Sequence, residues 1–325
     1  MCKCLLVSAC PLLYAFLLTS AFGQAWVPPK GEGEYSVAYQ DLYTTDHFFG
    51  DGSRHDRGKI RLLGLIQGVD YGLTDKLALT AAFPIGMGKY DGTFPHQVPI
   101  DNGNFHGAIQ DLGLTVRYNL RTHPSAVTPF IGTTFPSHHY EHFAHSAVGS
   151  RLWEIRVGVN VGRRLALLPN TYFQVQYSYA ISQRVLGIRP NRSRVASEFG
   201  YFMTRRLAVR ALANSQITHG GLDFPEDFPS TSPSDVRWQH HDQIARLDDL
   251  NLGGGASFAL TKSLDIFGSL VHSVWGANGH ALRTGLTIGV GWSFRTGRAA
   301  PQMAMADSNA DFAWRNKPVE INPCH

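Results

Sequence analysis

The chain has 325 residues, of which 43% are hydrophobic, and a net charge of +4. So small a charge gives no reason to expect nucleic acid as a partner. No apolar run after residue 25 is as long as a membrane-spanning helix, which excludes a helical membrane protein. A membrane β-barrel stays open, because alternating strands average to a neutral mean hydropathy, here −0.14.

The N-terminus has the pattern of a secretory signal peptide. A mostly apolar run from Leu5 to Leu18 follows a lysine and precedes several small residues. Cleavage after Gly23 or after Ala25 would satisfy the small-residue rule. We therefore expect a signal peptide over residues 1–25, which places the mature chain outside the cytoplasm.

The cysteines agree with this interpretation. Cys2, Cys4 and Cys10 leave with the signal peptide, so Cys324 remains alone and no intramolecular disulfide can form. Lack of disulfides mildly favours a barrel over a secreted soluble domain. Cys10 ends a stretch that resembles a lipoprotein cleavage box, but the apolar run before it is too short for us to expect lipidation.

Apolar residues alternate with small or polar residues along most of the mature chain. In Gly285–Phe294, the apolar residues fall at every second position and only Gly, Thr and Ser fall between them. That pattern suits a strand with one face in lipid and one in a crowded lumen. About twelve such strands are expected, each near the length that a tilted membrane strand needs. They lie near 33–46, 59–71, 77–90, 109–120, 127–136, 151–163, 171–182, 193–203, 207–216, 249–260, 264–275 and 282–294.

Connections between these segments alternate between short turns and long loops, as in bacterial outer-membrane barrels. The pattern predicts an all-β, antiparallel transmembrane β-barrel over residues 26–294, with ten to fourteen strands as the range. The loop over 217–248 is the longest, and we expect either a lid or partial plug or a solvated loop. Residues 295–325 lack a strand pattern and are expected to form a disordered periplasmic tail. A soluble periplasmic sandwich is the alternative fold.

Four segments resemble a known family. They are Trp26–Gly33, Asp70–Leu77, Gln110–Leu114 and Thr128–Gly132. Together they are similar to the bacterial outer-membrane family labelled as transporters of the meta-pathway of phenol degradation. The resemblance implies a porin-like barrel that passes small aromatic or hydrophobic compounds, but it transfers no binding residue. The chain departs from the common pattern by continuing beyond Phe294, because barrels often end on such an aromatic residue.

Charged residues at the expected inward positions form one candidate site. They are Arg61, Asp111, Arg117, Glu154, Arg156, Arg194, Glu198, Arg210, Asp265 and Arg283. Rings of charge can set the ion preference of a pore, here weakly for anions. The alternative is structural: the charges pair across the lumen and hold its wall.

Most of the fifteen histidines map to the expected loop side. The densest group is His138, His139, His142 and His145, with Glu141 among them. Imidazole nitrogens bind zinc and copper, so this loop is a candidate metal site. A polar loop without metal is the alternative, and loop opening on protonation is another.

Rim residues were weighed as a hydrolase site, because omptin-type proteases place Asp and His pairs at the barrel rim. His240, His241 and Asp242 form one candidate set, and Asp51 with His55 forms another. No nucleophile motif accompanies them. We therefore do not expect an enzyme.

Aromatic residues near the strand ends are typical of interfacial girdles. We interpret them as membrane anchors, although some, with Phe94, Phe105 and Phe224, would also suit an apolar entry for an aromatic solute. They are Tyr35, Tyr43, Tyr71, Phe83, Tyr90, Tyr118, Trp153, Tyr179, Tyr201, Trp275 and Trp292.

Together these patterns predict a passive channel of the bacterial outer membrane for small solutes, with no cofactor. Its expected partners are outer-membrane lipid, the barrel assembly machinery and a small-molecule solute, with no nucleic acid. A closed structural or surface-binding barrel with His-rich loops is the alternative, and a rim hydrolase is the weaker one.

Overall fold

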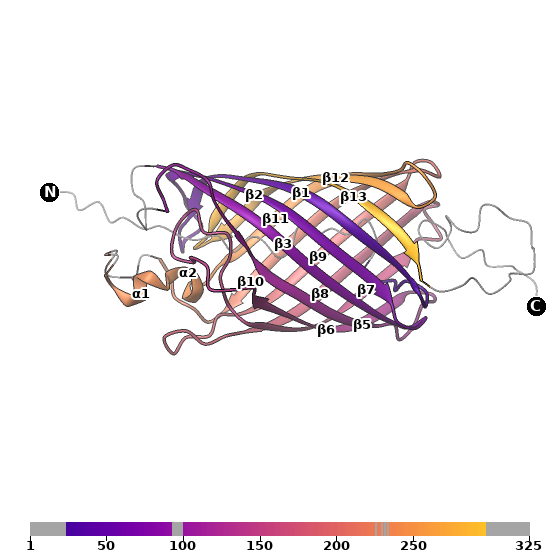
Figure 1. Cartoon of the computed structure of the whole chain (residues 1–325), viewed down its shortest axis with the longest axis horizontal. Coiled ribbons are helices and arrows are strands. Elements are labelled where there is room, and N and C mark those ends of the chain that lie inside the picture. The colour runs from indigo at the N-terminus through magenta and orange to yellow at the C-terminus, as the bar shows by residue number, and fades with distance from the viewer. Residues whose placement is uncertain are drawn as a thin grey trace, which may run out of the picture.

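A computed structural model of the protein describes residues 24–92, 100–224, 226–228, 230, 232 and 234–296. The expected tail lies outside these residues except for its first two positions, and so does the expected signal peptide except for Gln24 and Ala25. The described chain forms one β-barrel with two short helices at one end (Figure 1). We call that end the cap end and the opposite end, where the short turns lie, the turn end.

The wall of the barrel contains thirteen strand segments. They are β1 Glu32–Phe48, β2 Arg54–Gly72, β3 Leu77–Asp91, β4 His106–Ile109, β5 Asp111–Tyr118, β6 Ala126–Pro136, β7 Glu154–Arg164, β8 Thr171–Ser182, β9 Asn191–Phe202, β10 Leu207–His219, β11 Asp248–Ala259, β12 Leu264–Ala277 and β13 His280–Arg295. Because β4 and β5 both pair with β3 and are separated by Gln110 alone, they are one strand with a local break. The fold is therefore a twelve-stranded antiparallel barrel.

The barrel is closed by pairing between its first and last strands. The β1–β13 register runs from Glu32 opposite Arg295 to His47 opposite His280. All other neighbours are also antiparallel and follow one another in sequence. No strand of the wall is left with a free edge, which satisfies the backbone hydrogen bonds without solvent.

The outer face of the wall is apolar. Leu65 is 43% exposed, Ile288 54% and Trp292 58%, and each alternates with a residue that points inward. An exposed apolar band of this kind is what a lipid-facing barrel presents. The helices α1 (Val236–Gln239) and α2 (His241–Ile244) are four residues each. None of the described helices is long and apolar enough to cross a membrane.

The structure confirms all twelve predicted strands, most of them within two or three residues. The largest difference is at β2, which begins at Arg54 rather than near residue 59, because the β1–β2 hairpin extends beyond the neighbouring strands. Tyr90 also differs from the prediction. It points into the lumen, where it is 2% exposed, and so does not belong to a membrane girdle.

The apolar outer face makes a testable prediction at Ile288, near the middle of β13. Ile288→Arg should lower the free energy of unfolding from lipid vesicles by about 2–4 kcal/mol, because it places a cation in the hydrocarbon layer. Thr284→Arg, nearer the strand end, should cost only about 0–1 kcal/mol. Urea titration of both variants measures the difference, and equal costs would contradict a lipid-facing Ile288.

Candidate functional site

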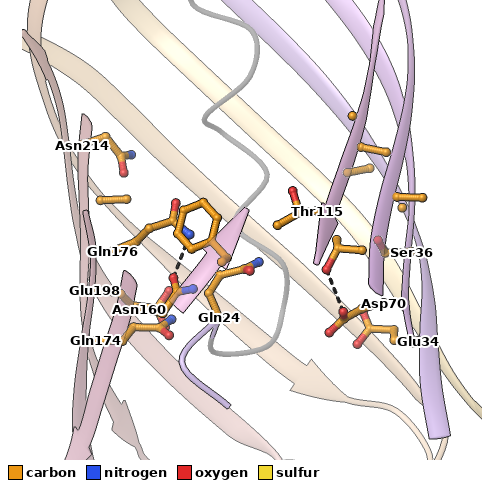
Figure 2. Close-up of a pocket in the computed structure, with 18 of the residues that line it drawn as sticks. Gln24, Glu34, Ser36, Asp70, Thr115, Asn160, Gln174, Gln176, Glu198 and Asn214 are labelled. Carbon is orange, nitrogen blue, oxygen red and sulfur yellow. Dashed lines mark hydrogen bonds between the residues drawn. The ribbon is translucent and has the colours of Figure 1, made fainter. Parts of the chain in front are cut away.

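A cavity of about 190 Å³ lies inside the barrel. Amide side chains line one wall: Asn160 on β7, Gln174 and Gln176 on β8, and Asn214 on β10 (Figure 2). The facing wall, from β1, β2 and β5, carries small residues and two carboxylates, those of Glu34 and Asp70. The cavity therefore has an amide side, which also carries Glu198 of β9, and a facing side with two carboxylates.

Two phenylalanines give the cavity its apolar surface. Phe130 on β6 and Phe267 on β12 are each almost fully buried and line the cavity with Leu212. The ring of Phe130 lies over Gly158, where a Cβ atom would approach the ring carbon Cζ to 2.6 Å. Gly289 likewise leaves room for the ring of Phe267, which a Cβ atom at this position would contact too closely. Glycine on the lumen face is thus required for these rings to lie flat against the wall.

The turn end of the cavity is bounded by the segment that precedes β1, of which Gln24, Ala25 and Trp26 lie inside the lumen. Arg117 holds this segment in place. Its Nη1 donates to the carbonyl oxygens of Gln24 at 2.9 Å and Trp26 at 3.2 Å, and its Nη2 donates to both carboxylate oxygens of Asp70. Arg117 is 2% exposed, so a charge-assisted pair fixes the N-terminal segment in a buried site.

Packing reinforces that attachment. Ala25 is fully buried, and its carbonyl oxygen accepts a hydrogen bond of 2.6 Å from Thr128 Oγ1. The Trp26 ring lies edge-on to Tyr172, and a Cβ on Gly162 would meet both Ala25 and Trp26 at 2.6 Å. The segment is therefore closely packed against the inner face of the wall at the turn end.

Towards the cap end an apolar cluster lies inside the lumen. Its members come from six strands and are all buried: Leu42, Ile60, Leu62, Tyr90, Leu212, Val271 and Leu282. Leu212 belongs both to this cluster and to the lining of the cavity. Apolar side chains therefore close the cavity on this side.

Two long connections form a cap over the cluster. The cap contains its own apolar core, formed by Phe143, Phe224, Phe228, Trp238, Ile244, Ala245 and Leu247. Gln243 joins the two connections through a hydrogen bond of 2.8 Å to the Ser150 carbonyl, and Gln110 on the wall donates to the Val148 carbonyl at 2.7 Å. The described part of the loop predicted over 217–248 thus folds as a lid.

Histidines are concentrated beneath this cap. His47 on β1 lies edge-on to His280 on β13 with ring centroids 4.4 Å apart, and edge-on to His145 at 5.8 Å. His145 also stacks on Tyr90 and has its Nδ1 3.2 Å from Asp101 Oδ2. All four rings are buried, so they form part of the interior of the cap end.

The structure does not gather the four histidines of the predicted metal site. His138 and His139 are exposed and contact Ser137 and Arg151, whereas His142 and His145 are buried at different places. Among the described residues, no group of three or more potential ligand side chains is arranged to hold a metal ion.

The predicted hydrolase residues also lie in arrangements unlike a catalytic site. His241 and Asp242 are buried in the cap, where a substrate at the rim would not reach them. In the other set, Ser53 Oγ contacts Asp51 at 2.6 Å and His55 at 2.9 Å. The carboxylate therefore binds the hydroxyl instead of orienting the histidine, which is the reverse of a triad.

Eight of the ten charges predicted for the lumen point inward: Asp111, Arg117, Glu154, Arg156, Arg194, Glu198, Arg210 and Asp265. The other two do not. Arg61 is 53% exposed and pairs with Asp41 on the outer face, and Arg283 is exposed beside a β-bulge. The sequence analysis missed Asp70, Arg192 and Glu34, which also face the lumen.

Three arginines converge on the carboxylate of Glu154. Arg194 approaches it at 2.6 Å, Arg192 at 3.1 Å and Arg156 at 3.9 Å. A second pair, Arg210 and Glu198, is 3.8 Å apart. These inward charges therefore have oppositely charged neighbours, and Arg156 is held least closely.

Solved structures to which this chain is similar include an outer-membrane channel and a porin. An outer-membrane channel from Pseudomonas putida F1 is similar over 84% of this chain and 98% of its own, at 15% identity and a TM-score of 0.65. The NanC porin is similar over 81% and 100%, at 11% identity and a TM-score of 0.46. No family model matches the chain, and no curated protein matches it. The likeness shows the fold, and the resemblance to phenol-pathway transporters is not confirmed by a family match.

The attachment of the N-terminal segment predicts the effect of Arg117→Ala. The change removes the donor of two buried carbonyl oxygens and the cation beside Asp70, so undocking of the segment should become easier by about 3 kcal/mol. Hydrogen exchange at the Val27 amide of the folded barrel should accelerate by at least about tenfold. Arg121→Ala, at an exposed turn, is the control, and an unchanged rate in Arg117→Ala would show that Arg117 does not hold the segment.

The cap should also respond to pH. Burial, with the charge of Arg151 and the neighbouring His240, His139 and His241, lowers the pKa of His142 to about 3. In an opened cap this pKa returns to about 6.5, so between those values the open state binds more protons than the closed state. The closed cap is therefore fully favoured above about pH 6.5 and loses stability as the pH falls through this window.

Burial also lowers the pKa of His145, although Asp101 opposes the shift. Burial alone would raise the pKa of Asp101, but the bonds and charge of His145 and Ser146 outweigh it and hold the pKa at about 2, so Asp101 stays ionised. Quenching of Trp238 fluorescence by an aqueous quencher should rise between pH 7.5 and 5. His142→Leu should weaken that rise, and an identical pH response in both proteins would exclude His142 as a contributor.

Proposed function

We propose that this protein is a passive channel of the bacterial outer membrane for small solutes. The observation that carries the proposal is a cavity enclosed in the lumen of a twelve-stranded barrel with an apolar outer face. A solute in that cavity would be separated from lipid by the wall and from both aqueous sides by movable segments. The shared fold with an outer-membrane channel supports the same function.

The lining favours a small solute with an apolar body. Phe130, Leu212 and Phe267 supply apolar surface, and amides of β7, β8 and β10 supply hydrogen bonds. A site with mostly apolar contacts and a few placed polar groups is typical of small-molecule recognition. Small aromatic compounds, which the resemblance to phenol-pathway transporters implies, match this chemistry.

Passage requires movement at both ends of the cavity. The N-terminal segment fills the turn end, and the apolar cluster and the cap fill the other. Gly50 joins the cap to the rim, where its N–H lies 3.3 Å from the Phe224 carbonyl. We place the cap outside the cell and the turn end in the periplasm, reached by way of the signal peptide and the barrel assembly machinery.

The alternative is a closed barrel with a structural or surface-binding role. The buried cluster under the cap favours it, because a lumen filled by apolar side chains needs no solute. Two measurements together separate these alternatives. Purified protein in planar bilayers should show conductance, and proteoliposomes should take up phenol faster than empty vesicles. Absence of both conductance and phenol uptake would contradict the channel function and favour the closed barrel.

A disulfide between rim and cap tests whether the cap is the gate. A Cβ placed on Gly50 would lie 3.9 Å from the Cβ of Asp223, a separation that disulfides adopt. The double variant Gly50→Cys, Asp223→Cys, in a Cys324→Ser background, should lose most of its conductance when oxidised and regain it on reduction. Either single variant is the control. Equal conductance in both redox states would mean that solutes pass without moving the cap.

A further inference from the structure

Arg156 is the feature of the cavity that its structural surroundings explain least. Its side chain is 15% exposed, yet among the described residues its guanidinium makes no hydrogen bond. Its nearest acceptor, Glu154, is 3.9 Å away and already receives bonds from Arg192 and Arg194. Its Nε is buried without a hydrogen-bond partner, and leaving a buried guanidinium donor unmatched is costly.

A second donor on the same cavity is also unmatched. Asn214 is 7% exposed, and its Nδ2 has no hydrogen-bond partner among the described residues. The neighbouring amides differ, because Gln176 donates to Asn160 at 2.7 Å and Asn160 donates to the Thr128 carbonyl at 3.3 Å. The cavity is thus lined by one cation that makes no hydrogen bond to a described residue, Arg156, and by one unmatched amide donor, Asn214, which Figure 2 shows on the amide side.

We propose that Arg156 anchors the carboxylate of a small organic acid whose apolar body lies against Phe130. Arg156, Gly158 and Asn160 occupy successive inward positions of β7, and the Phe130 ring covers Gly158 between the other two. A planar carboxylate pairs with a guanidinium through two parallel hydrogen bonds. The ring of an aromatic acid would then continue over the ring of Phe130.

The other charges of the cavity select for a monoanion in this orientation. Of the described lining residues, Arg156 is the single basic one, whereas Glu34, Asp70 and Glu198 are acidic. Asp70 is paired with Arg117, and Glu198 contacts Arg210 and Tyr172. A dianion such as phosphate would meet too few cations here. A monocarboxylate would turn its charge to Arg156 and its ring away from Glu34.

This inference names the solute class of the proposed channel, but its test does not depend on transport. Benzoate and benzamide have the same shape and differ in charge, so their binding to the folded barrel in detergent is compared by calorimetry. Wild-type protein should bind benzoate at least about tenfold more tightly than benzamide. Arg156→Gln should remove that preference and leave benzamide affinity within about twofold.

Two further variants sharpen the result. Arg163→Gln changes an exposed arginine of the same strand and should leave both affinities unchanged. Arg156→Lys keeps the charge but loses the planar fork, so benzoate should bind with intermediate affinity. Because Arg192 and Arg194 still hold Glu154, the barrel should fold in each case, as heat-modifiable gel mobility would check. No preference for benzoate in wild type, or an equal loss of both ligands in Arg156→Gln, would overturn the proposal.

Vesicle uptake of the same two solutes separates this inference from the proposed function. If the vesicles take up both solutes without preference and no binding depends on Arg156, the channel function is supported and the proposed role of Arg156 is rejected. Binding of benzoate through Arg156 with uptake of neither solute would keep the anchor and reject the channel.

Discussion

The pairing of the first strand with the last is the interaction on which the rest of the structure depends. A bilayer offers no hydrogen-bonding groups, so a sheet can cross it only when both of its edges are paired. The β1–β13 seam meets this requirement along its whole length, with Glu32 and Arg295 bound to each other at one end. Closure also fixes which face of each strand is inside, and therefore which side chains meet in the lumen.

A closed wall of twelve strands leaves little space in the lumen. The residues of the inner face therefore have to leave room for the elements that pack against them. Glycine appears where another element presses against the wall: a Cβ on Gly158 would strike Phe130, and one on Gly88 would strike the Ser146 carbonyl of the cap loop. The remaining space is divided into an occupied turn end, a cavity and an occupied cap end. Any transport function therefore depends on the segments inside the wall more than on the wall itself.

Alternation and turn residues were enough to locate all twelve strands, because the lipid-facing side of each strand is visible as apolar residues at every second position of that strand. The predicted inward or outward orientation of a side chain was wrong where the alternation of apolar and polar residues was absent or interrupted. Around Arg61, Leu62 and Ile66 line the lumen while Leu63 and Leu65 face outward, so both faces are apolar and alternation carries no information. At Arg283, a β-bulge opposite Tyr43 and Thr44 shifts the phase by one residue.

Contacts between distant segments could not be predicted from the sequence, for a different reason. The docking of Trp26 beneath Arg117 and the core of the cap join residues with no fixed spacing, so no periodic signal marks them. The histidine groups were visible as composition, but their partners were not. The same holds for Arg156, whose inward position was predicted although its lack of a hydrogen-bond partner was not.

The seam has a further consequence for the order of assembly. Glu32 and Arg295 are 263 positions apart, so the contact that closes the barrel cannot form until the last strand has been made. Contacts of such long separation are slow to form. The N-terminal segment leads directly into β1 and ends up inside the wall, so it must be drawn in before or during closure. The final folding step would then seal the barrel around the segment that precedes its first strand.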